Sequence, residues 1–233
     1  MKNLCVILAR GGSKGIPKKN IVDLNGRHLI SYTIDAAIKS EIFDEIVVST
    51  DCDEIAKVAI DCGALIPFMR PEELSLDHVW SRDALKHAVL ECERIFNKTY
   101  DYIFELPCVA PLRNSTHIKE ACKKLVKTGA DSVISVCKMQ DKHPVRMKRI
   151  VDDKIYDFCE IHTEGEGSRR QDLDPCYIRN GAIYSMTREC IVENFSRKGD
   201  ISRPYIMEDV DSVNIDSYID LFTASAIMNM RKK

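Results

Sequence analysis

LCVILA at residues 4–9, followed directly by RGGSKGIPKKN at residues 10–20, is the stretch from which the fold can be inferred. The first six residues form a continuous apolar run, which is typical of a parallel β-strand covered on both faces. The next eleven contain three glycines, one proline, four cations and no acid. Open α/β sheets bind ligands at the carboxyl ends of their strands, and a turn rich in glycine and cations suits a polyphosphate there. We therefore predict a buried strand that ends in an anion-binding loop.

Two familiar phosphate-binding loops do not fit this segment. A Walker A loop needs Gly-x4-Gly-Lys-Ser/Thr, but Ile16 stands five residues after Gly11. The dinucleotide pattern GxGxxG fails as well, because Ser13 and Lys14 follow Gly12. A solvated basic turn is the alternative, although it explains poorly why glycines and cations are interleaved.

The remainder of the chain alternates strand-like and helix-like segments. Further strands are expected at 46–50, 65–69, 102–106 and 132–136. Helices are expected at 28–39, 51–62 (opened by a capping pair of Asp51 and Glu54), 81–96, 118–126 and 216–230. Repeated βα units predict an open, mostly parallel, Rossmann-like α/β sheet with helices on both faces. The length of the chain predicts that residues 1–233 form a single domain.

One region breaks the alternation. From residue 138 to 177 the helical period disappears, and residues 146–151 and 154–158 read as a β-hairpin around the turn at Asp152-Asp153. A polar segment at 160–175 follows. A long insertion of this kind is usually functional or interfacial, so we expect a protruding, β-rich arm that packs on another subunit. A surface excursion without a partner is the alternative.

Composition excludes several classes of protein. The 34 Lys and Arg nearly balance the 36 Asp and Glu, so the net charge is −2 and a globally basic nucleic-acid binder is not expected. No apolar stretch approaches the ~20 residues of a membrane span, and residues 4–9 are too short for a signal sequence. We therefore expect a cytoplasmic protein that binds neither nucleic acid nor membrane.

The ten cysteines and six histidines carry no metal-site signature. The smallest separation between cysteines is ten residues, so there is no CxxC, and no histidine pair has HExxH spacing. Most of the cysteines occupy apolar strand or helix positions, where a free thiol packs like a small hydrophobe. Structural thiols in a reducing compartment are the expectation.

Residues 9–20 resemble the signature Ala-Arg-x-x-Ser-Lys-Gly-x-Pro-x-Lys-Asn of the acylneuraminate cytidylyltransferases, the CMP-sialic acid synthetase family, at every fixed position. More of that family's pattern recurs in order: Ser49-Thr50-Asp51, Arg70-Pro71-x-x-Leu74, Pro111-Leu112-Arg113, His143-Pro144, Arg170-Gln171 and Asn180-Gly181-Ala182-Ile183-Tyr184. The similarity spans nearly the whole chain.

The resemblance implies transfer of CMP from CTP to the anomeric hydroxyl of a nine-carbon 2-keto sugar acid, with release of pyrophosphate. It assigns the triphosphate to the catalytic residues Arg10, Lys14 and Lys19, with Ser13 and Asn20 beside them. It assigns cytidine to Arg70 and Ser81. It places the sugar acid near Arg146, Arg170, Asn180 and Tyr184, and it implies that the arm forms a dimer.

A second cluster, near the carboxyl end, is acidic. If residues 212–216 are extended, Asn214 and Asp216 lie on the same face, and oxygen ligands of this kind suit Mg²⁺. The family's metal pair usually reads Asp-Ile-Asp, where this chain has Asn214-Ile215-Asp216, so Asp211 is a further candidate ligand. Acids that cap the last helix are the alternative.

The sugar-recognition pattern departs from the family. The usual Leu-Gln-Pro-Thr-Ser-Pro-Leu-Arg is replaced by residues 106–113, LPCVAPLR, and Arg-Pro before Asn-Gly-Ala-Ile-Tyr is replaced by Ile178-Arg179. A more apolar wall favours an acceptor such as legionaminic acid over N-acetylneuraminic acid. Two alternatives stay open: a related enzyme for the eight-carbon octulosonate, and a nucleotide- or anion-binding module without catalysis.

Overall fold

The computed structural model describes residues 1–139, 142–159 and 173–231. The main strands are β1 (Asn3–Leu8), β4 (Glu45–Ser49), β5 (Tyr102–Glu105), β6 (Ser132–Lys138), β9 (Tyr177–Thr187) and β10 (Ser202–Met207). The helices are α1 (Leu29–Ser40), α2 (Asp53–Asp61), α3 (Ser81–Phe96), α4 (Ser115–Thr128), α5 (Arg188–Val192) and α6 (Tyr218–Met230). Short elements are β2 (Asp23–Leu24), β3 (Arg27–His28) and the 3-10 turns η1 (Lys19–Ile21), η2 (Glu72–Leu74), η3 (Pro144–Arg146) and η5 (Asp209–Asp211).

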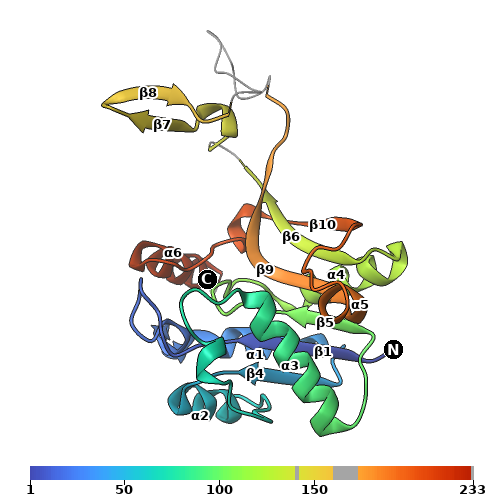
Figure 1. The fold of residues 1–233 in the computed structure, drawn as a ribbon. Coiled ribbons are helices and arrows are strands. Elements are labelled where there is room, and N and C mark those ends of the chain that lie inside the picture. Colours follow the sequence, from blue (N-terminus) through green and yellow to red (C-terminus); the bar gives the residue numbers. More distant parts are fainter. Residues whose placement is uncertain (140–141, 160–172, 232–233) are drawn as a thin grey trace.

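The six main strands form one sheet in the order β10-β6-β9-β5-β1-β4 (Figure 1). β1 runs parallel to β4 and β5, and β10 runs parallel to β6, which confirms the predicted open, mostly parallel α/β sheet. β9 is the exception, because it is antiparallel to both β5 and β6. The chain leaves the sheet at the end of β6 and returns as β9 beside it, so the two strands bracket the arm and must run in opposite directions.

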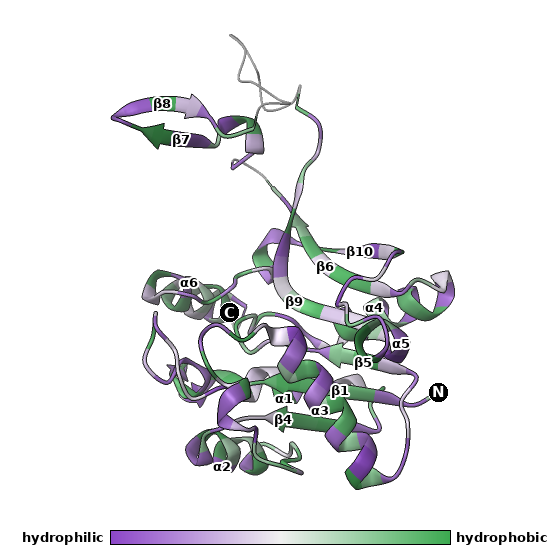
Figure 2. Cartoon of the chain, viewed as in Figure 1, coloured by the Kyte–Doolittle hydropathy of each residue, from purple (hydrophilic) through white to green (hydrophobic). Residues whose placement is uncertain are grey.

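The core lies on both faces of the sheet, as alternation along β1 requires. Cys5 and Ile7 pack into a cluster with side chains of α1, α2 and α4. Leu4 and Val6 point the other way, into a cluster with α3 and α5. Figure 2 shows the apolar colour along β1 and β4.

The arm contains the predicted hairpin. It consists of β7 (Lys148–Val151) and β8 (Lys154–Asp157), which pair antiparallel and project away from the sheet (Figure 1). Asp152 and Asp153 both have positive φ, 49° and 60°, as a two-residue type I′ turn requires. Most of the predicted polar segment 160–175 lies outside the described residues.

Two local predictions were wrong. The expected strand at 65–69 makes only an isolated bridge between Leu65 and Val47. The helix expected from residue 51 begins at Asp53 without a side-chain cap, because the carboxylate of Asp51 is used elsewhere, as described below.

Six of the ten cysteines are buried, and burial raises the pKa of the Cys92 and Cys108 thiols to about 12 each.

Within the part of the chain that the structure describes, no helix is both long and apolar enough to cross a membrane.

Candidate active site

The loop of residues 10–20 leaves the carboxyl end of β1 and is held in shape by polar contacts. The backbone N–H of Gly11 donates to Oδ1 of Asp51 over 2.8 Å, and Nδ2 of Asn20 donates to the carbonyl oxygen of Arg10 over 2.9 Å. Ile16 is fully buried in a small apolar cluster with Ile215 and side chains of α6. The loop is therefore fixed at its start, middle and end.

This loop forms most of the wall of a cavity of about 410 Å³. The lining residues are Leu8, Arg10, Gly12, Ser13, Lys14, Gly15, Lys19, Asn20 and Asp216. The structure thus brings together all five residues that the sequence analysis placed at the triphosphate, and adds one of the three candidate metal ligands.

Two of the cations share a carboxylate that the sequence analysis did not identify. Asp77, between η2 and α3, accepts from Nη2 of Arg10 through Oδ1 at 2.8 Å and pairs with Nζ of Lys14 through Oδ2 at 2.9 Å. Its hydrogen bond to Lys14 and the nearby Arg10 lower the pKa of the Asp77 carboxyl. Asp77 therefore holds a negative charge where the two cations converge.

The third cation joins the loop to the carboxyl-terminal segment. Nζ of Lys19 lies 2.8 Å from Oδ1 of Asp216 and donates to the carbonyl oxygen of Ile215 over 3.0 Å. Gly15 passes so close to this segment that a Cβ there would lie 2.4 Å from the carbonyl oxygen of Asp216. Only glycine allows that approach, so residues about 200 positions apart in the chain form one site.

Asn214 and Asp216 lie side by side, as the alternating pattern predicted: Nδ2 of Asn214 donates to Oδ2 of Asp216 over 3.3 Å. Among the described residues, no group of three or more His, Cys, Asp or Glu side chains could hold a metal ion. One carboxylate and one amide oxygen fit a Mg²⁺ ion that takes its remaining ligands from water and substrate phosphates.

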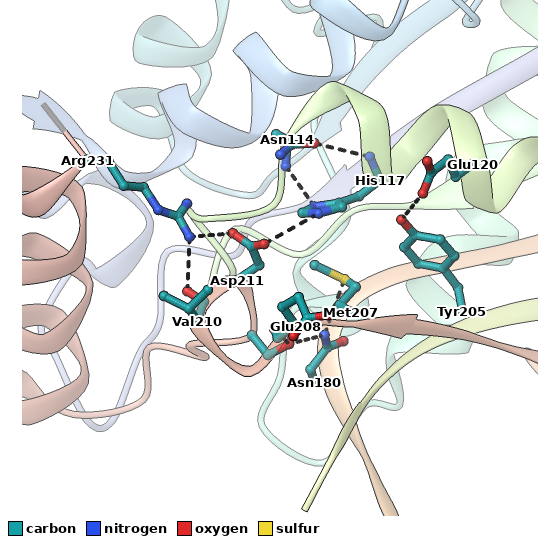
Figure 3. A network of polar contacts seen from close by, with 11 residues as sticks. Asn114, His117, Glu120, Asn180, Tyr205, Met207, Glu208, Val210, Asp211 and Arg231 are labelled. Atoms are coloured by element: carbon teal, nitrogen blue, oxygen red, sulfur yellow. Dashed lines mark hydrogen bonds and ion pairs between the residues drawn. The ribbon is translucent and has the colours of Figure 1, made fainter.

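The third candidate ligand, Asp211, belongs to a different network (Figure 3). Its Oδ1 accepts from Nη2 of Arg231 over 2.6 Å, and its Oδ2 lies 3.6 Å from Nε2 of His117. Burial lowers the pKa of His117. The network ties η5 to the start of α4 and the end of α6, so both oxygens of Asp211 are engaged away from Asp216.

Arg70 is almost completely buried at the end of β4. Its Nε donates to Oγ of Ser49 over 3.0 Å, its Nη2 donates to the Ser49 carbonyl oxygen, and its backbone N–H donates to the Thr50 carbonyl oxygen over 2.7 Å. Burial lowers the pKa of its guanidinium. Arg70 thus fixes the carboxyl end of β4, the strand that pairs with β1.

A second cavity, of about 600 Å³, lies over the β10-β6-β9 side of the sheet. It is lined by Trp80, Ile134, Val136, Arg179, Tyr184, Arg197, Lys198, Ser202, Arg203 and Pro204. Four of these residues are cationic, and none of the described lining residues is acidic. Tyr184, predicted at the sugar acid, therefore faces a positively charged pocket with apolar walls.

Ser81, predicted at cytidine, lies at the first position of α3 and accepts a hydrogen bond from Nη1 of Arg197 over 2.7 Å. Nη2 of Arg197 lies 2.8 Å from Oε2 of Glu105, and its guanidinium stacks over the ring of Tyr184 at 4.0 Å. Glu105, at the end of β5, is only 4% exposed, and burial raises the pKa of its carboxyl to about 7.

Of the other predicted sugar contacts, the two that the structure describes, Asn180 and Arg146, line neither cavity. Asn180 is buried, accepts from Oγ of Ser135 over 2.6 Å and donates to Oγ of Ser212 over 2.8 Å, so its amide is engaged within the protein. Arg146 lies in η3 on the arm. Arg170 lies outside the described residues.

Sequence reasoning missed three residues: Asp77, which pairs with two cations of the first cavity, Arg197, which lines the second cavity, and Glu105, which pairs with Arg197. An acid at the end of an otherwise apolar strand was the available signal for Glu105, because a buried carboxylate requires a partner. Asp77 and Arg197 lie in irregular segments, where no periodicity marks which side chain points inward.

The sequence profile of the cytidylyltransferase family matches residues 4–194. Pseudaminic acid cytidylyltransferase of Campylobacter jejuni is 39% identical over 195 residues, which cover 83% of this chain and 82% of that protein. N-acylneuraminate cytidylyltransferase of Streptococcus agalactiae is 36% identical over 222 residues, 94% of this chain but 52% of that protein. CMP-N,N′-diacetyllegionaminic acid synthase of Legionella pneumophila is 31% identical over 248 residues, 100% of this chain and 99% of that protein.

Among solved structures, CMP:2-keto-3-deoxy-manno-octonic acid synthetase complexed with CTP superposes with a TM-score of 0.72. The match covers 99% of this chain and 100% of that chain at 16% identity, so it establishes the fold. The profile covers well over half of the chain, and the residues that resemble the family signature line one cavity. The chain belongs to the cytidylyltransferase family and is a nucleotidyltransferase.

Proposed function

We propose that this enzyme transfers CMP from CTP to the anomeric hydroxyl of a nonulosonic acid and releases pyrophosphate. The observation that carries the proposal is the convergence of Arg10, Lys14 and Lys19 on one cavity of about 410 Å³ at the carboxyl end of β1. Three cations on a glycine-rich loop suit the triphosphate of a nucleotide.

The chemistry follows from this charge distribution. The acceptor hydroxyl gives up its proton to solvent, its oxygen attacks the α-phosphorus, the bond to the β-phosphate oxygen breaks, and pyrophosphate leaves. Negative charge grows on the phosphate oxygens, so positioned cations stabilise the transition state more than the ground state. Arg10 and Lys14 serve this role when the nucleotide tail replaces the Asp77 carboxylate that now contacts them, and Lys19 serves it beside Asp216. Ser13 lines the same cavity, and Asn20 orients Arg10 through its backbone.

Asp216, with Asn214 beside it, would hold Mg²⁺ together with the phosphates. When bound, the ion would neutralise charge on the triphosphate. Lys19 pairs with the same carboxylate, so it keeps Asp216 at the edge of the phosphate cavity.

The acceptor pocket is the cavity of about 600 Å³ that Tyr184 and Arg197 line. Its cationic lining suits a sugar acid, and Ile134, Val136 and Pro204 suit deoxy positions and acyl groups. The names of relatives refer to pseudaminic acid, to N-acylneuraminate and to N,N′-diacetyllegionaminic acid. We therefore propose a nonulosonic acid with few hydroxyls, such as a legionaminic acid, as the acceptor.

A matrix assay tests the proposal. Each of the four NTPs is incubated with Mg²⁺ and one of N-acetylneuraminic, N,N′-diacetyllegionaminic, pseudaminic or octulosonic acid, and pyrophosphate is measured. We expect release with CTP and a nonulosonic acid only, stopped by EDTA and restored by Mg²⁺. A higher kcat/KM with octulosonate, or with N-acetylneuraminic acid, would contradict the proposed acceptor; absence of release with every pair would contradict the activity.

A further inference from the structure

Arg197 contacts three residues that come from three separate elements. One terminal nitrogen donates to Oγ of Ser81 at the start of α3 over 2.7 Å, and the other lies 2.8 Å from Oε2 of Glu105 at the end of β5. The flat side of the guanidinium rests 4.0 Å from the ring centre of Tyr184 on β9. A long, flexible side chain is thereby fixed in one orientation before any ligand binds.

The fixed guanidinium still has hydrogen-bond donors to offer. Each of its two terminal nitrogens carries two hydrogens; Ser81 accepts one of them, and Glu105 is held as a close ion pair. Arg197 lines the cavity of about 600 Å³, whereas Glu105 does not contribute to its lining and lies behind the guanidinium at 4% exposure. The charge pair therefore presents its cationic side to the cavity.

We propose that Arg197 binds the carboxylate of the acceptor acid, and that Glu105 positions it to do so. The inference rests on the proposed function and names the residue that selects an acid. In a cyclic 2-keto acid, the carboxyl carbon is bonded to the anomeric carbon, which also carries the attacking hydroxyl. Holding the carboxylate in a planar fork therefore orients the nucleophile as well.

Arg197 is better suited to this role than the other cations of the cavity. Arg179 and Arg203 are exposed, and neither side chain makes a hydrogen bond or ion pair with the residues that the structure describes. An unrestrained arginine loses side-chain entropy when it binds, whereas Arg197 has lost it on folding. Pre-organisation therefore favours Arg197.

The experiment compares each nonulosonic acid that the wild type uses with its methyl ester. The readout is the ratio of kcat/KM for the acid to that for the ester. Arg197→Lys keeps the charge but loses the fork, and we expect the ratio to fall roughly tenfold or more, as expected for the loss of a charged hydrogen bond. The Kd for CTP alone, measured by titration calorimetry, should change less than about threefold.

Removal of Arg197 alone leaves a buried carboxylate unpaired, so a folding defect is anticipated. The double variant Glu105→Leu/Arg197→Met removes both charges and keeps the volume, and we expect it to fold while its acid-to-ester ratio approaches one. Arg188→Lys is the matched control. It alters a paired arginine that bonds Glu93 over 2.7 Å and lines neither cavity, so it should leave the ratio unchanged.

Two results would overturn the inference: an unchanged ratio in the folded double variant, or loss of the ratio in Arg203→Lys but not in Arg197→Lys. A wild type that neither binds CTP nor releases pyrophosphate with any acid contradicts the proposed function instead. The two failures are therefore distinguishable.

Discussion

Each cation of the phosphate loop is balanced by a carboxylate of the chain itself. Arg10 and Lys14 share Asp77, and Lys19 pairs with Asp216. Asp77 and Asp216 are more than half exposed, so these ion pairs are screened by water and are individually weak. A triphosphate, with several negative charges, can therefore replace Asp77 at Arg10 and Lys14 at small cost.

Lys19→Ala should reduce kcat by at least about a hundredfold while the protein stays folded. Loss of one preorganised donor typically costs ~3 kcal/mol of transition-state stabilisation. Arg10→Ala should behave alike. The measurement is the turnover number for pyrophosphate release together with the thermal midpoint. Lys57→Ala, on the exposed side of α2, is the control; a near-wild-type kcat in Lys19→Ala would remove Lys19 from the mechanism.

Asp77→Asn should bind CTP more tightly than the wild type. The substitution removes a charge that competes with the triphosphate for Arg10 and Lys14, and two exposed ion pairs are together worth roughly 1 kcal/mol, or about fivefold in Kd. Titration calorimetry at low and high salt measures the effect, which should shrink as salt screens the pairs.

The control for that experiment is Glu72→Gln, which removes a charge from the same segment without touching either cation. Weaker CTP binding by Asp77→Asn would mean that Asp77 orients the two cations for the nucleotide instead of competing with it.

Hydrophobic runs predicted β1, β4, β5, β6 and the described α-helices other than α5, because burial imposes a regular spacing on apolar residues. They predicted neither β9 nor β10, and the direction of β9 depends on where the arm returns the chain to the sheet. Nor did they predict that residues 65–69 pair only through Leu65. The same limit applies to the site. The sequence predicted the residues that are adjacent in the loop, whereas Asp77 and Arg197 lie in irregular segments that only tertiary packing brings to the site.

Gly15 shows how two elements define the site. A Cβ at residue 15 would clash with the carbonyl oxygen of Asp216, which is backbone and cannot rotate away. Gly15→Ala should therefore lower the thermal midpoint by a few degrees, as roughly 1–3 kcal/mol of overpacking predicts for a chain of this size. It should also weaken CTP binding, because the loop must move away from the segment that carries Asp216.

The matched variant is Gly12→Ala in the same loop, where a Cβ would meet nothing within 4 Å. Its thermal midpoint should stay close to that of the wild type. Equal midpoints for the two variants would show that the loop and the segment at Asp216 are not in contact in solution.

The hairpin of the arm lies apart from the core of the molecule (Figure 1). A two-stranded hairpin is at best marginally stable alone in water, yet β7 and β8 project from the body (Figure 1). Ile150 and Ile155 are cross-strand partners and are 73% and 71% exposed, and Figure 2 shows the apolar colour on this hairpin. Exposed apolar side chains at a projecting tip indicate a covering surface. We propose that this surface belongs to a second copy of the chain in a homodimer.

The double variant Ile150→Glu/Ile155→Glu should convert a wild-type dimer into a monomer, because two buried charges without partners would oppose association. Sedimentation equilibrium at micromolar concentration measures the mass. Ile60→Glu, at a 57%-exposed position on α2, is the control and should stay dimeric. The thermal midpoint of the variant monomer should change only by the part that dimerisation contributes, which grows with protein concentration. A monomeric wild type, or a double variant that still sediments as a dimer, would mean that the hairpin covers no partner.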